Sequence, residues 1–356
     1  MPVLTLTATD ALQRLAEFDT IIDARTQSEF ALDRLPAAVN WPSLTDDERA
    51  RVGTEYKQLS PFTAKKRGAA LVARNIADHI ERELIETGKD WKPLVYCWRG
   101  GKRSGSLALV LDQIGFKVHL LEGGYAEFRR AVVAALEELP QRFSYRVICG
   151  KTGSGKSRLL SELALQGAQV LDLEALANHR GSVLGLVPGS PQPSQKQFDT
   201  RVWNALRQFD ASRTVWIESE SKKVGELRVP QPLIERMRAS PCVRLELPVQ
   251  ARVDLLMQDY DFFVQDVPVF CERLDALRAL RGNDVVNVWQ EAAKSGRIES
   301  VVRELLLDHY DPVYLASMQR NFADFGNALL VEPLNGDAGT LREVAAGLLS
   351  YPKNRS

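Results

Sequence analysis

Residues 94–106 read LVYCWRGGKRSGS, and this stretch decides the fold of the N-terminal part of the chain. Its apolar start, residues 94–96, predicts a buried strand that ends at Cys97. Two glycines, Gly100 and Gly101, predict a turn, and the apolar spacing from Leu107 onward predicts a helix. Such a strand, turn and helix direct backbone N–H groups toward one point, which therefore attracts an anion.

Cys97 is placed at that point, so we predict that it is nucleophilic near neutral pH. The field of the turn and three nearby cations would stabilise its thiolate. We assign catalysis to Cys97 and Arg103, and anion binding to Arg99, Gly100, Gly101 and Lys102. The alternative is that Cys97 is a core cysteine at the end of a buried strand. A core cysteine, however, would not need the three cations and two glycines that follow Cys97 within six residues.

Composition limits the class of protein. The chain has 356 residues, 45% hydrophobic and 26% charged, which is typical of a globular protein with two domains. The N-terminus has no signal-peptide pattern, and no apolar run is long enough to span a bilayer. The four cysteines show neither metal-ligand spacing nor disulfide density. We therefore expect a cytoplasmic protein with no membrane partner.

The charge is unevenly distributed along the chain. The formal net charge is zero, which argues against a general polycation. Residues 141–240, however, carry 15 basic and 9 acidic side chains. An excess of this kind suits the handling of phosphates, although a solvated surface would show it as well. We expect Arg201 and Arg207, on the helix after QPSQKQ, to contact any nucleic acid bound there.

The N-terminal segment resembles a rhodanese domain over about residues 8–138. The resemblance lies in DARTQSEF (23–30), LPAAVNWP (35–42), the cysteine loop and LLEGGYAEFR (120–129). In that family the loop cysteine carries a persulfide. Leu35 stands where a histidine is usual, and the spacing from Cys97 to Arg103, C-x5-R, is the longer loop with which rhodanese-like phosphatases hold a tetrahedral phosphate.

A second phosphate-binding motif comes after a short polar hinge. Residues 150–157 read GKTGSGKS, which satisfies G-x-x-x-x-G-K-S between a predicted strand (146–149) and a predicted helix (157–165). Glycines let the backbone wrap a phosphate, Lys156 reaches its oxygens, and Ser157 can hold Mg²⁺. The predicted diphosphate-binding residues are Gly150, Thr152, Gly153, Ser154, Gly155, Lys156 and Ser157. ATP hydrolysis is not implied, since another diphosphate would fit equally well.

Four further residues are candidates for supporting this loop: Asp172, His179, Arg180 and Glu218. Glu218 closes a predicted strand at 215–218 and is the nearest counterpart of a Walker B aspartate, which the chain lacks. It either binds Mg²⁺ together with Ser157 or caps the strand. The predicted fold is α/β: a rhodanese-like domain (1–138), then a P-loop NTPase-like α/β domain (139–356) with a mostly helical insertion at about 250–325.

The combination of both domains resembles the tRNA 2-selenouridine synthase family over nearly the whole chain. Its supporting motifs are DLEALANHRGS (172–182), QPSQKQFD (192–199), WIESES (216–221) and YDPVY (310–314). The resemblance implies conversion of wobble 2-thiouridine to 2-selenouridine in the tRNAs for Lys, Glu and Gln. It implies two steps, S-geranylation from geranyl diphosphate and then selenation from selenophosphate.

From the two loops themselves we infer how this chemistry is divided. The P-loop would hold geranyl diphosphate, and Arg99, Gly100, Gly101 and Lys102 would hold selenophosphate while Cys97 takes up selenium as an S-selanyl group. No tightly bound cofactor is implied; tRNA and a selenophosphate-supplying enzyme are the expected partners. The alternatives are a rhodanese-type sulfurtransferase and a P-loop kinase with a rhodanese-like regulatory domain.

Overall fold

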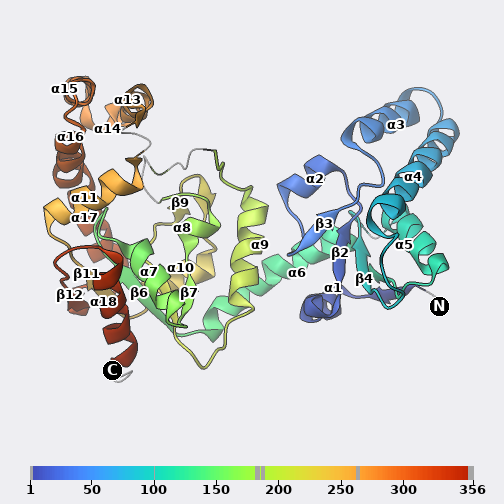
Figure 1. Cartoon of the computed structure of the whole chain (residues 1–356), viewed down its shortest axis with the longest axis horizontal. Coiled ribbons are helices and arrows are strands. Elements are labelled where there is room, and N and C mark those ends of the chain that lie inside the picture. Colours follow the sequence, from blue (N-terminus) through green and yellow to red (C-terminus); the bar gives the residue numbers. More distant parts are fainter. Residues whose placement is uncertain (1–2, 100, 181–184, 186–188, 262–264, 352–356) are drawn as a thin grey trace. The chain divides into compact units, whose positions relative to one another are not determined.

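The computed structural model of the chain describes residues 3–99, 101–180, 185, 189–261 and 265–351. It divides into two compact units (Figure 1). The first comprises Met1–Ala135 and Pro193–Asn204, and the second comprises Leu136–Gln192 and Ala205–Ser356. Each unit contains a parallel sheet with helices, so the predicted α/β class is confirmed.

The first unit is built on a five-stranded sheet in the order β1-β5-β4-β2-β3, with every pairing parallel. Its strands are β1 (Leu4–Leu6), β2 (Thr20–Asp23), β3 (Ala38–Asn40), β4 (Pro93–Tyr96) and β5 (His119–Leu121). Its helices are α1 (Ala8–Gln13), α2 (Gln27–Leu32), α3 (Asp46–Gln58), α4 (Pro61–Glu83), α5 (Lys102–Ile114) and α6 (Gly124–Glu138). The central strand β4 is buried throughout, which explains its continuous apolar run.

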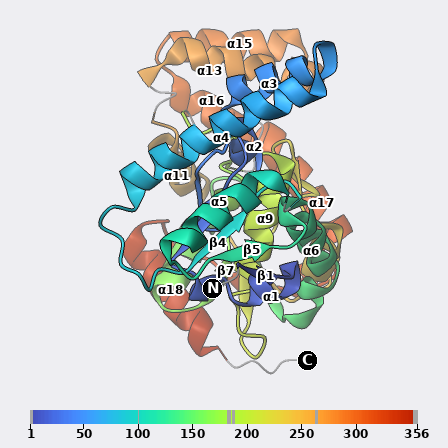
Figure 2. The same ribbon diagram turned by 90° about the vertical axis from the view of Figure 1, so that its right-hand side faces the viewer.

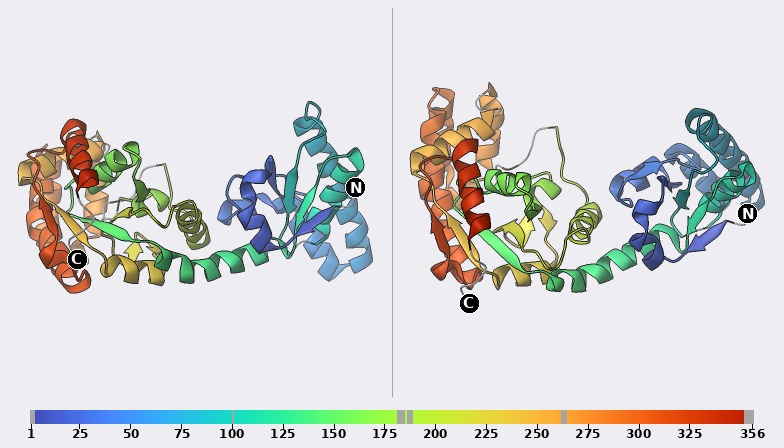
Figure 3. Two further views of the ribbon diagram at one scale, coloured as in Figure 1. Left: turned by 90° about the horizontal axis from the view of Figure 1, so that it is seen from below. Right: turned by 60° about the horizontal axis from the view of Figure 1, so that its bottom comes forward.

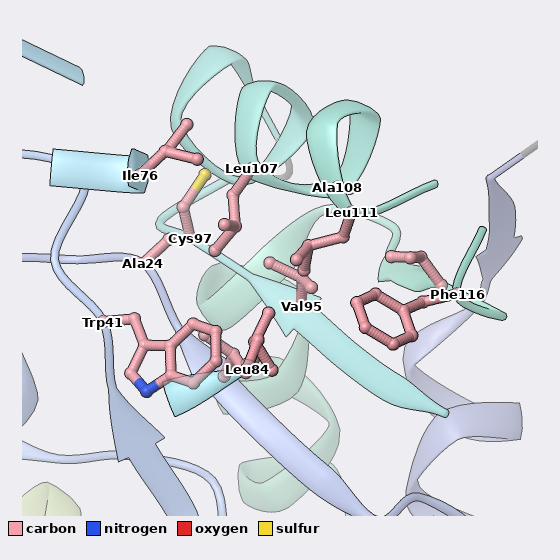
Figure 4. Packing of buried hydrophobic residues seen from close by; sticks show 12 residues of the cluster. Ala24, Trp41, Ile76, Leu84, Val95, Cys97, Leu107, Ala108, Leu111 and Phe116 are labelled. Atoms are coloured by element: carbon pink, nitrogen blue, oxygen red, sulfur yellow. The ribbon is translucent and has the colours of Figure 1, made fainter. Parts of the chain in front are cut away.

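The core of the first unit surrounds this central strand. Helices α4 and α5 both lie over the sheet (Figure 2). Between them, Ile76, Val95, Leu107 and Leu111 are buried in one hydrophobic cluster. Cys97 belongs to the same cluster, and its sulfur points toward Ile76 and Leu107 at the edge (Figure 4). The position of Cys97 is therefore fixed by core packing as well as by the loop.

A buried polar network connects the start of α6 to the rest of the first unit. Arg25 is 1% exposed and donates to Asp23 and to the carbonyl oxygen of Asp33. Tyr125 packs against the Arg25 guanidinium at 4.0 Å and donates from its hydroxyl to Asp33 Oδ2. Thr200, on α9 (Gln195–Leu206), donates to the same carboxylate oxygen. Segment 193–204 thus completes the first unit although it comes after the P-loop in sequence.

The second unit has a five-stranded parallel sheet in the order β12-β11-β6-β8-β7. Its strands are β6 (Tyr145–Cys149), β7 (Gln169–Leu171), β8 (Val215–Glu218), β11 (Cys242–Leu245) and β12 (Leu329–Val331), and a hairpin of β9 (Lys223–Val224) and β10 (Leu227–Arg228) stands apart from it. Its sheet-covering helices are α7 (Lys156–Leu165), α8 (Leu173–Leu176), α10 (Gln231–Arg238) and α18 (Ala338–Ser350). Helix α18 packs against α7 (Figure 3).

A helical insertion lies between β11 and β12, as predicted. Its elements are α11 (Val249–Asp259), α13 (Val267–Asp275), α14 (Arg278–Arg281), α15 (Asn283–Lys294), α16 (Ile298–Glu304), a π-helix (Leu305–Tyr310) and α17 (Asp311–Asn321). It has a hydrophobic core of its own, which includes Phe270, Leu274 and Trp289. A π-helix turn inside a helix is frequently found at a functional site, and this one carries His309 and Tyr310.

We expect the buried Arg25–Asp23 pair to control the stability of the first unit. Arg25→Met removes one partner and leaves a buried carboxylate unpaired, which costs about 3–5 kcal/mol of unfolding free energy. The control is Arg130→Met, because Arg130 is 72% exposed and its pair with Glu127 is worth less than about 1 kcal/mol. Chemical denaturation measures both; equal stability of the two variants would contradict a structural role for the buried pair.

Candidate functional site

The Cys97 loop joins the carboxyl end of β4 to the first turn of α5. Gly101 is the N-cap residue of α5 and has no side chain to bind the first-turn N–H groups. Ser104, in that first turn, lies with its Oγ 3.0 Å from Cys97 Sγ and 3.3 Å from the Gly101 carbonyl oxygen. From the other side, Tyr125 N–H donates to the Cys97 carbonyl oxygen at 2.8 Å, which fixes the loop against α6.

The pKa of the Cys97 thiol is lowered in this setting. Burial is the largest influence and raises the pKa, since only 3% of the residue is exposed. The Ser104 hydroxyl and the backbone N–H groups of Ser104, Arg99 and Gly101 outweigh it by stabilising the thiolate. The sequence attributed this effect to the turn and three cations, whereas in the structure the Ser104 hydroxyl and backbone N–H groups lower the pKa of Cys97.

The three loop cations differ in their environments. Arg103 donates to Glu29 Oε2 at 2.9 Å and is 20% exposed, so it forms an ion pair with the DARTQSEF segment. Arg99 and Lys102 are exposed. Gly100, which we also assigned to anion binding, lies outside the described residues. The structure thus brings Arg103 beside the loop with its guanidinium already paired, while Arg99 and Lys102 face solvent.

The P-loop joins β6 to α7 in the geometry that its sequence demands. Gly153 and Gly155 have φ angles of 76° and 81°, in the left-handed region that favours glycine. A Cβ atom on Gly150 would lie 2.3 Å from Ser154 Oγ and 2.8 Å from the Leu245 carbonyl oxygen. Lys156 Nζ donates to the Gly150 carbonyl oxygen at 2.8 Å, so the lysine folds back over the loop where a phosphate would lie.

Two helices of the insertion hold the P-loop from outside. Arg252 on α11 is 1% exposed and donates from Nε and Nη2 to the Thr152 carbonyl oxygen at 2.9 and 2.8 Å. Its guanidinium also forms a bidentate pair with Asp311 on α17, at 2.9 and 2.6 Å. One turn later, the Tyr314 hydroxyl accepts the Gly150 N–H at 2.6 Å. The YDPVY motif therefore serves to position the loop.

Carboxylates gather on the opposite side of the loop. Ser157 Oγ donates to Glu174 Oε2 at 2.9 Å, and the Glu174 N–H donates to Glu218 Oε1 at 3.0 Å. Glu218 is fully buried, and its Oε2 has no hydrogen-bond partner among the residues that the structure describes. Burial, followed by the charges of Asp172, Glu174 and Glu220, raises the pKa of Glu218 well above its usual range. Burial and then Glu174 raise the pKa of Glu220 to about 8.

A cleft of about 1090 Å³ opens over the P-loop within the second unit. The P-loop and the carboxylates beside it contribute Gly153, Lys156, Ser157, Glu174 and Glu220 to its lining. The remainder of its lining includes a set of apolar and aromatic side chains from the helical insertion: Leu256, Tyr260, Leu280, Tyr310, Val313, Tyr314 and Met318. The cleft is thus suited to a ligand with an anionic head and an apolar body.

The structure brings most predicted P-loop residues together. Asp172 accepts the Ala175 N–H as the N-cap of α8, and burial raises its pKa. His179 is 6% exposed, lines the cleft and has its pKa lowered by burial. Arg180 also lines the cleft, donates to the Asp259 carbonyl oxygen and lies over the Tyr260 ring at 4.9 Å. The Cys97 loop and the P-loop belong to different units.

Sequence reasoning missed five residues around the loop: Glu174, Glu220, Arg252, Asp311 and Tyr314. YDPVY was quoted only as a motif of the family resemblance, and nothing in it predicted a contact with Gly150. Arg252 left a fainter signal, since a basic residue spaced like Val249, Leu255 and Leu256 falls on the buried side of an apolar helix stripe. Glu174 and Glu220 lie in the quoted motifs DLEALANHRGS and WIESES, but their approach to each other beside Ser157 depends on the packing of separate strands.

Together, the cysteine loop and the P-loop define a protein in which a rhodanese-like domain is joined to a P-loop domain. The chain matches the rhodanese-like domain family over residues 7–131 and the tRNA 2-selenouridine synthase AAA domain over residues 143–281. Relatives that carry the name tRNA 2-selenouridine synthase match most of its length. The chain therefore belongs to the tRNA 2-selenouridine synthase family.

The tRNA 2-selenouridine synthase of Nitrosomonas europaea is 30% identical, covering 87% of this chain and 92% of that protein. The tRNA 2-selenouridine synthase of Aeromonas salmonicida is 32% identical, covering 83% of this chain and 86% of that protein. Among solved structures, a rhodanese-related protein from Thermoplasma volcanium matches 36% of this chain and 92% of its own, with 16% identity and a TM-score of 0.24. In the part of the chain that the structure describes, no helix is long and apolar enough to cross a membrane.

We expect Ser104→Ala to raise the pKa of the Cys97 thiol, because the substitution removes a hydroxyl that stabilises the thiolate. Less thiolate would then be present at neutral pH. The measurement is the pH dependence of thiolate ultraviolet absorbance, with the spectrum of Cys97→Ser subtracted. The control is Ser106→Ala, since Ser106 Oγ donates to the Lys102 carbonyl oxygen on the same helix. An unchanged titration in Ser104→Ala would show that the hydroxyl serves Gly101 alone.

Proposed function

We propose that this chain converts wobble 2-thiouridine to 2-selenouridine in the tRNAs for Lys, Glu and Gln, in two chemical steps. The P-loop cleft would transfer a geranyl group from geranyl diphosphate to the thiouridine sulfur, and the Cys97 loop would then supply selenium from selenophosphate. The observation that carries the first step is the cleft itself. Its lining combines a diphosphate-binding loop with leucine, valine, methionine and tyrosine side chains.

In the first step, sulfur attacks C1 of the geranyl group, the C1–O bond breaks, and diphosphate leaves with the bonding electrons. The base loses its N3 proton to solvent. Lys156 Nζ and the N–H groups that begin α7 would stabilise the charge on the leaving diphosphate. Alkylation prepares the base for selenation, because a thiocarbonyl sulfur leaves poorly whereas an S-alkyl group makes C2 open to a nucleophile.

Mg²⁺ would fit beside the P-loop, and we propose Ser157 and Glu218 as the residues that hold it. The buried and unpartnered Oε2 of Glu218, close to a hydroxyl and further carboxylates, supports this assignment. Among the described residues, no three histidine, cysteine, aspartate or glutamate side chains form a metal site by themselves. Mg²⁺ in phosphate sites usually takes one or two protein ligands and completes its shell with phosphate and water oxygens, and its charge would neutralise the diphosphate.

In the second step, electron balance favours attack on phosphorus over attack on selenium. An S-selanyl group formed directly from selenophosphate would have to expel phosphite, a poor leaving group. Attack of the Cys97 thiolate on phosphorus instead breaks the P–Se bond and releases hydrogen selenide. Hydrogen selenide attacks C2 of the geranylated base, the C2–S bond breaks, and geranylthiol leaves. Water then cleaves the cysteine S–P bond, which returns the thiolate and releases phosphate.

The contacts of Cys97 support this role. The N–H groups of Arg99, Gly101 and Ser104 that stabilise the sulfur would donate to phosphate oxygens once sulfur is bonded to phosphorus. The C-x5-R spacing gives the loop the length that a tetrahedral phosphate needs. A selenophosphate-supplying enzyme is the partner that this step requires.

Two alternative functions make different predictions. A sulfurtransferase would move sulfur from thiosulfate to cyanide without Lys156, and a P-loop kinase would consume ATP. The sequence alone counted against the kinase because it lacks a Walker B aspartate. Glu218, however, ends β8 beside the P-loop strand, so an acidic residue occupies that place. The deciding experiment is mass spectrometry of nucleosides from thiolated tRNA treated with geranyl diphosphate and then selenophosphate; products with neither modification would refute the proposal.

Lys156→Ala should abolish geranylation. The substitution removes the cation that faces the diphosphate, and each charge-assisted hydrogen bond is worth roughly 1.5–3 kcal/mol, so the rate should fall at least about tenfold. Selenation of a tRNA geranylated beforehand should persist. Lys151→Ala is the control in the same loop, since Lys151 Nζ lies 3.8 Å from Asp311 Oδ2. Equal loss of both steps in Lys156→Ala would contradict the assignment of the P-loop to geranylation.

Cys97→Ser should geranylate thiouridine and stop there, because serine is a far weaker nucleophile toward selenophosphate. The S-geranyl nucleoside should accumulate in digests of the treated tRNA. Cys271→Ala, a change at a buried cysteine of α13, should still form selenouridine. If Cys97→Ser forms selenouridine at the parent rate, Cys97 has no covalent role; if it cannot geranylate either, the two steps do not divide between the loops as proposed.

A further inference from the structure

Helices α3 and α4 of the first unit form an antiparallel hairpin whose far end has no role in the core or in the proposed chemistry (Figures 1 and 2). The turn between them, Leu59 and Ser60, is short. Thr45 begins α3 with a capping box, and Ser60 caps α4 with Pro61 at its first position. The hairpin is therefore well defined up to its end, which we call the hairpin tip (residues 56–66).

Positive charge is concentrated in the part of the hairpin around its tip, while acidic residues lie at the far ends of both helices. Residues 49–74 contain seven basic side chains and one acidic one, although the whole protein is neutral. The single acid, Glu55, is buried and paired with Arg67. Lys57, Lys65 and Lys66 are exposed and have no ion-pair partner within the described ranges. The excess matches that of segment 141–240, but it is concentrated in about a quarter of the length.

The hairpin tip also exposes large apolar side chains between these cations. Leu59 is 77% exposed, Phe62 69% and Tyr56 48%. Lys66 Nζ lies 4.9 Å from the centre of the Phe62 ring, so a cation covers part of this aromatic side chain. Exposed aromatic rings among unpaired lysines are the arrangement with which proteins hold single-stranded nucleic acid, the rings stacking on bases and the lysines meeting phosphates.

The hairpin is fixed at its other end to the neighbourhood of Cys97. Ile76 of α4 packs in the same buried cluster as Cys97. Asn75 donates to the Ser43 carbonyl oxygen, and Ser43 Oγ donates to the Arg103 carbonyl oxygen. Fourteen residues of helix separate Ile76 from Phe62, about 21 Å at 1.5 Å per residue. That distance is roughly six nucleotides along a strand, so one RNA hairpin could reach both places.

We infer that the hairpin tip is an RNA-docking surface that holds the tRNA beside the nucleotide being modified. In this assignment, which rests on the proposed function, Lys57, Lys65 and Lys66 contact phosphates while Tyr56 and Phe62 stack on unpaired bases. Sequence-specific recognition of RNA mostly uses such unpaired segments. The same lysines and apolar side chains would suit an anionic membrane surface. The family and the tight clustering of aromatic rings with lysines favour RNA, and the membrane is an outcome of the test.

The test measures binding of a tRNA transcript and of its isolated anticodon stem–loop to the full chain by fluorescence anisotropy over a range of salt concentrations. Lys65→Glu combined with Lys66→Glu should weaken binding at least about tenfold and reduce the log–log salt slope by about one to two. The matched control is Lys89→Glu with Lys92→Glu, which changes net charge equally at exposed lysines of the same unit. It should change affinity by less than about twofold.

A second variant tests stacking without a change of charge. Tyr56→Ala with Phe62→Ala should weaken binding of the stem–loop on the order of tenfold, leave the salt slope unchanged, and affect a blunt duplex of the same stem much less. Circular dichroism checks that α3 and α4 are retained. Equal binding by the tip variants and the control would overturn the inference. The inference would also be overturned if the tip variants lost binding to phosphatidylglycerol vesicles but still bound RNA, because the tip would then be a membrane-binding surface.

These outcomes separate the surface from the reaction. Nucleoside mass spectrometry at saturating tRNA should show that the tip variants still form modified nucleosides. If the tip variants bind tRNA as tightly as the unsubstituted protein, and that protein modifies nucleosides, the docking surface is refuted and the proposed function stands. A parent protein that binds tRNA through the tip but modifies no nucleoside would refute the proposed function and leave the surface in place.

Discussion

The first turn of every helix leaves backbone N–H groups without partners inside the helix, and the chemistry of this chain depends on where those groups are left free. Several helices of the chain have these N–H groups bound by side chains: Thr26 caps α2, Thr45 caps α3 and Asp337 caps α18. At α5 and α7 the N-cap residues are Gly101 and Gly155, which have no side chain to offer. The N–H groups of these two helices therefore remain available for a thiolate or a phosphate.

Free N–H groups are useful only if the loops that present them are rigid, and distant residues provide that rigidity. Arg252 and Tyr314 both bind the N-terminal end of the P-loop, although 100 and 164 residues separate them from their partners Thr152 and Gly150. In the cysteine loop, Tyr125 and Ser104 have the corresponding role. Donors that are already oriented need no reorganisation when charge develops, which is the main electrostatic advantage of an enzyme site. The helical insertion is thus part of the site, since it supplies both Arg252 and Tyr314.

Local patterns allowed prediction of both loops, since each motif contains its own strand, turn and helix within about twenty residues. Lys156 and Cys97 lie where the sequence placed them for that reason. Contacts made by tertiary packing could not be predicted in this way. Glu174 meets Ser157 only because β7 and β6 flank β8, and Arg103 is paired because α2 presents Glu29. The hairpin tip was missed for a related reason: its cations come from α3 and α4, and only the packing of these two helices brings them onto one surface.

The most consequential departure from a linear domain order is segment 193–204, because it makes the first unit depend on sequence beyond the P-loop. Thr200 donates to Asp33, a buried carboxylate whose pKa burial raises, and Asp199 pairs with Arg129 of α6. Phe128 meets Trp203 edge-on at 5.8 Å. Asp33 in turn accepts the Tyr125 hydroxyl, and Tyr125 holds the Cys97 carbonyl oxygen. A chain cut at residue 138 would therefore leave Asp33 short of one donor and Phe128 without its contact to Trp203. The rhodanese-like unit is completed only when the P-loop half of the sequence has been added, so its cysteine loop has its full support only in the intact chain.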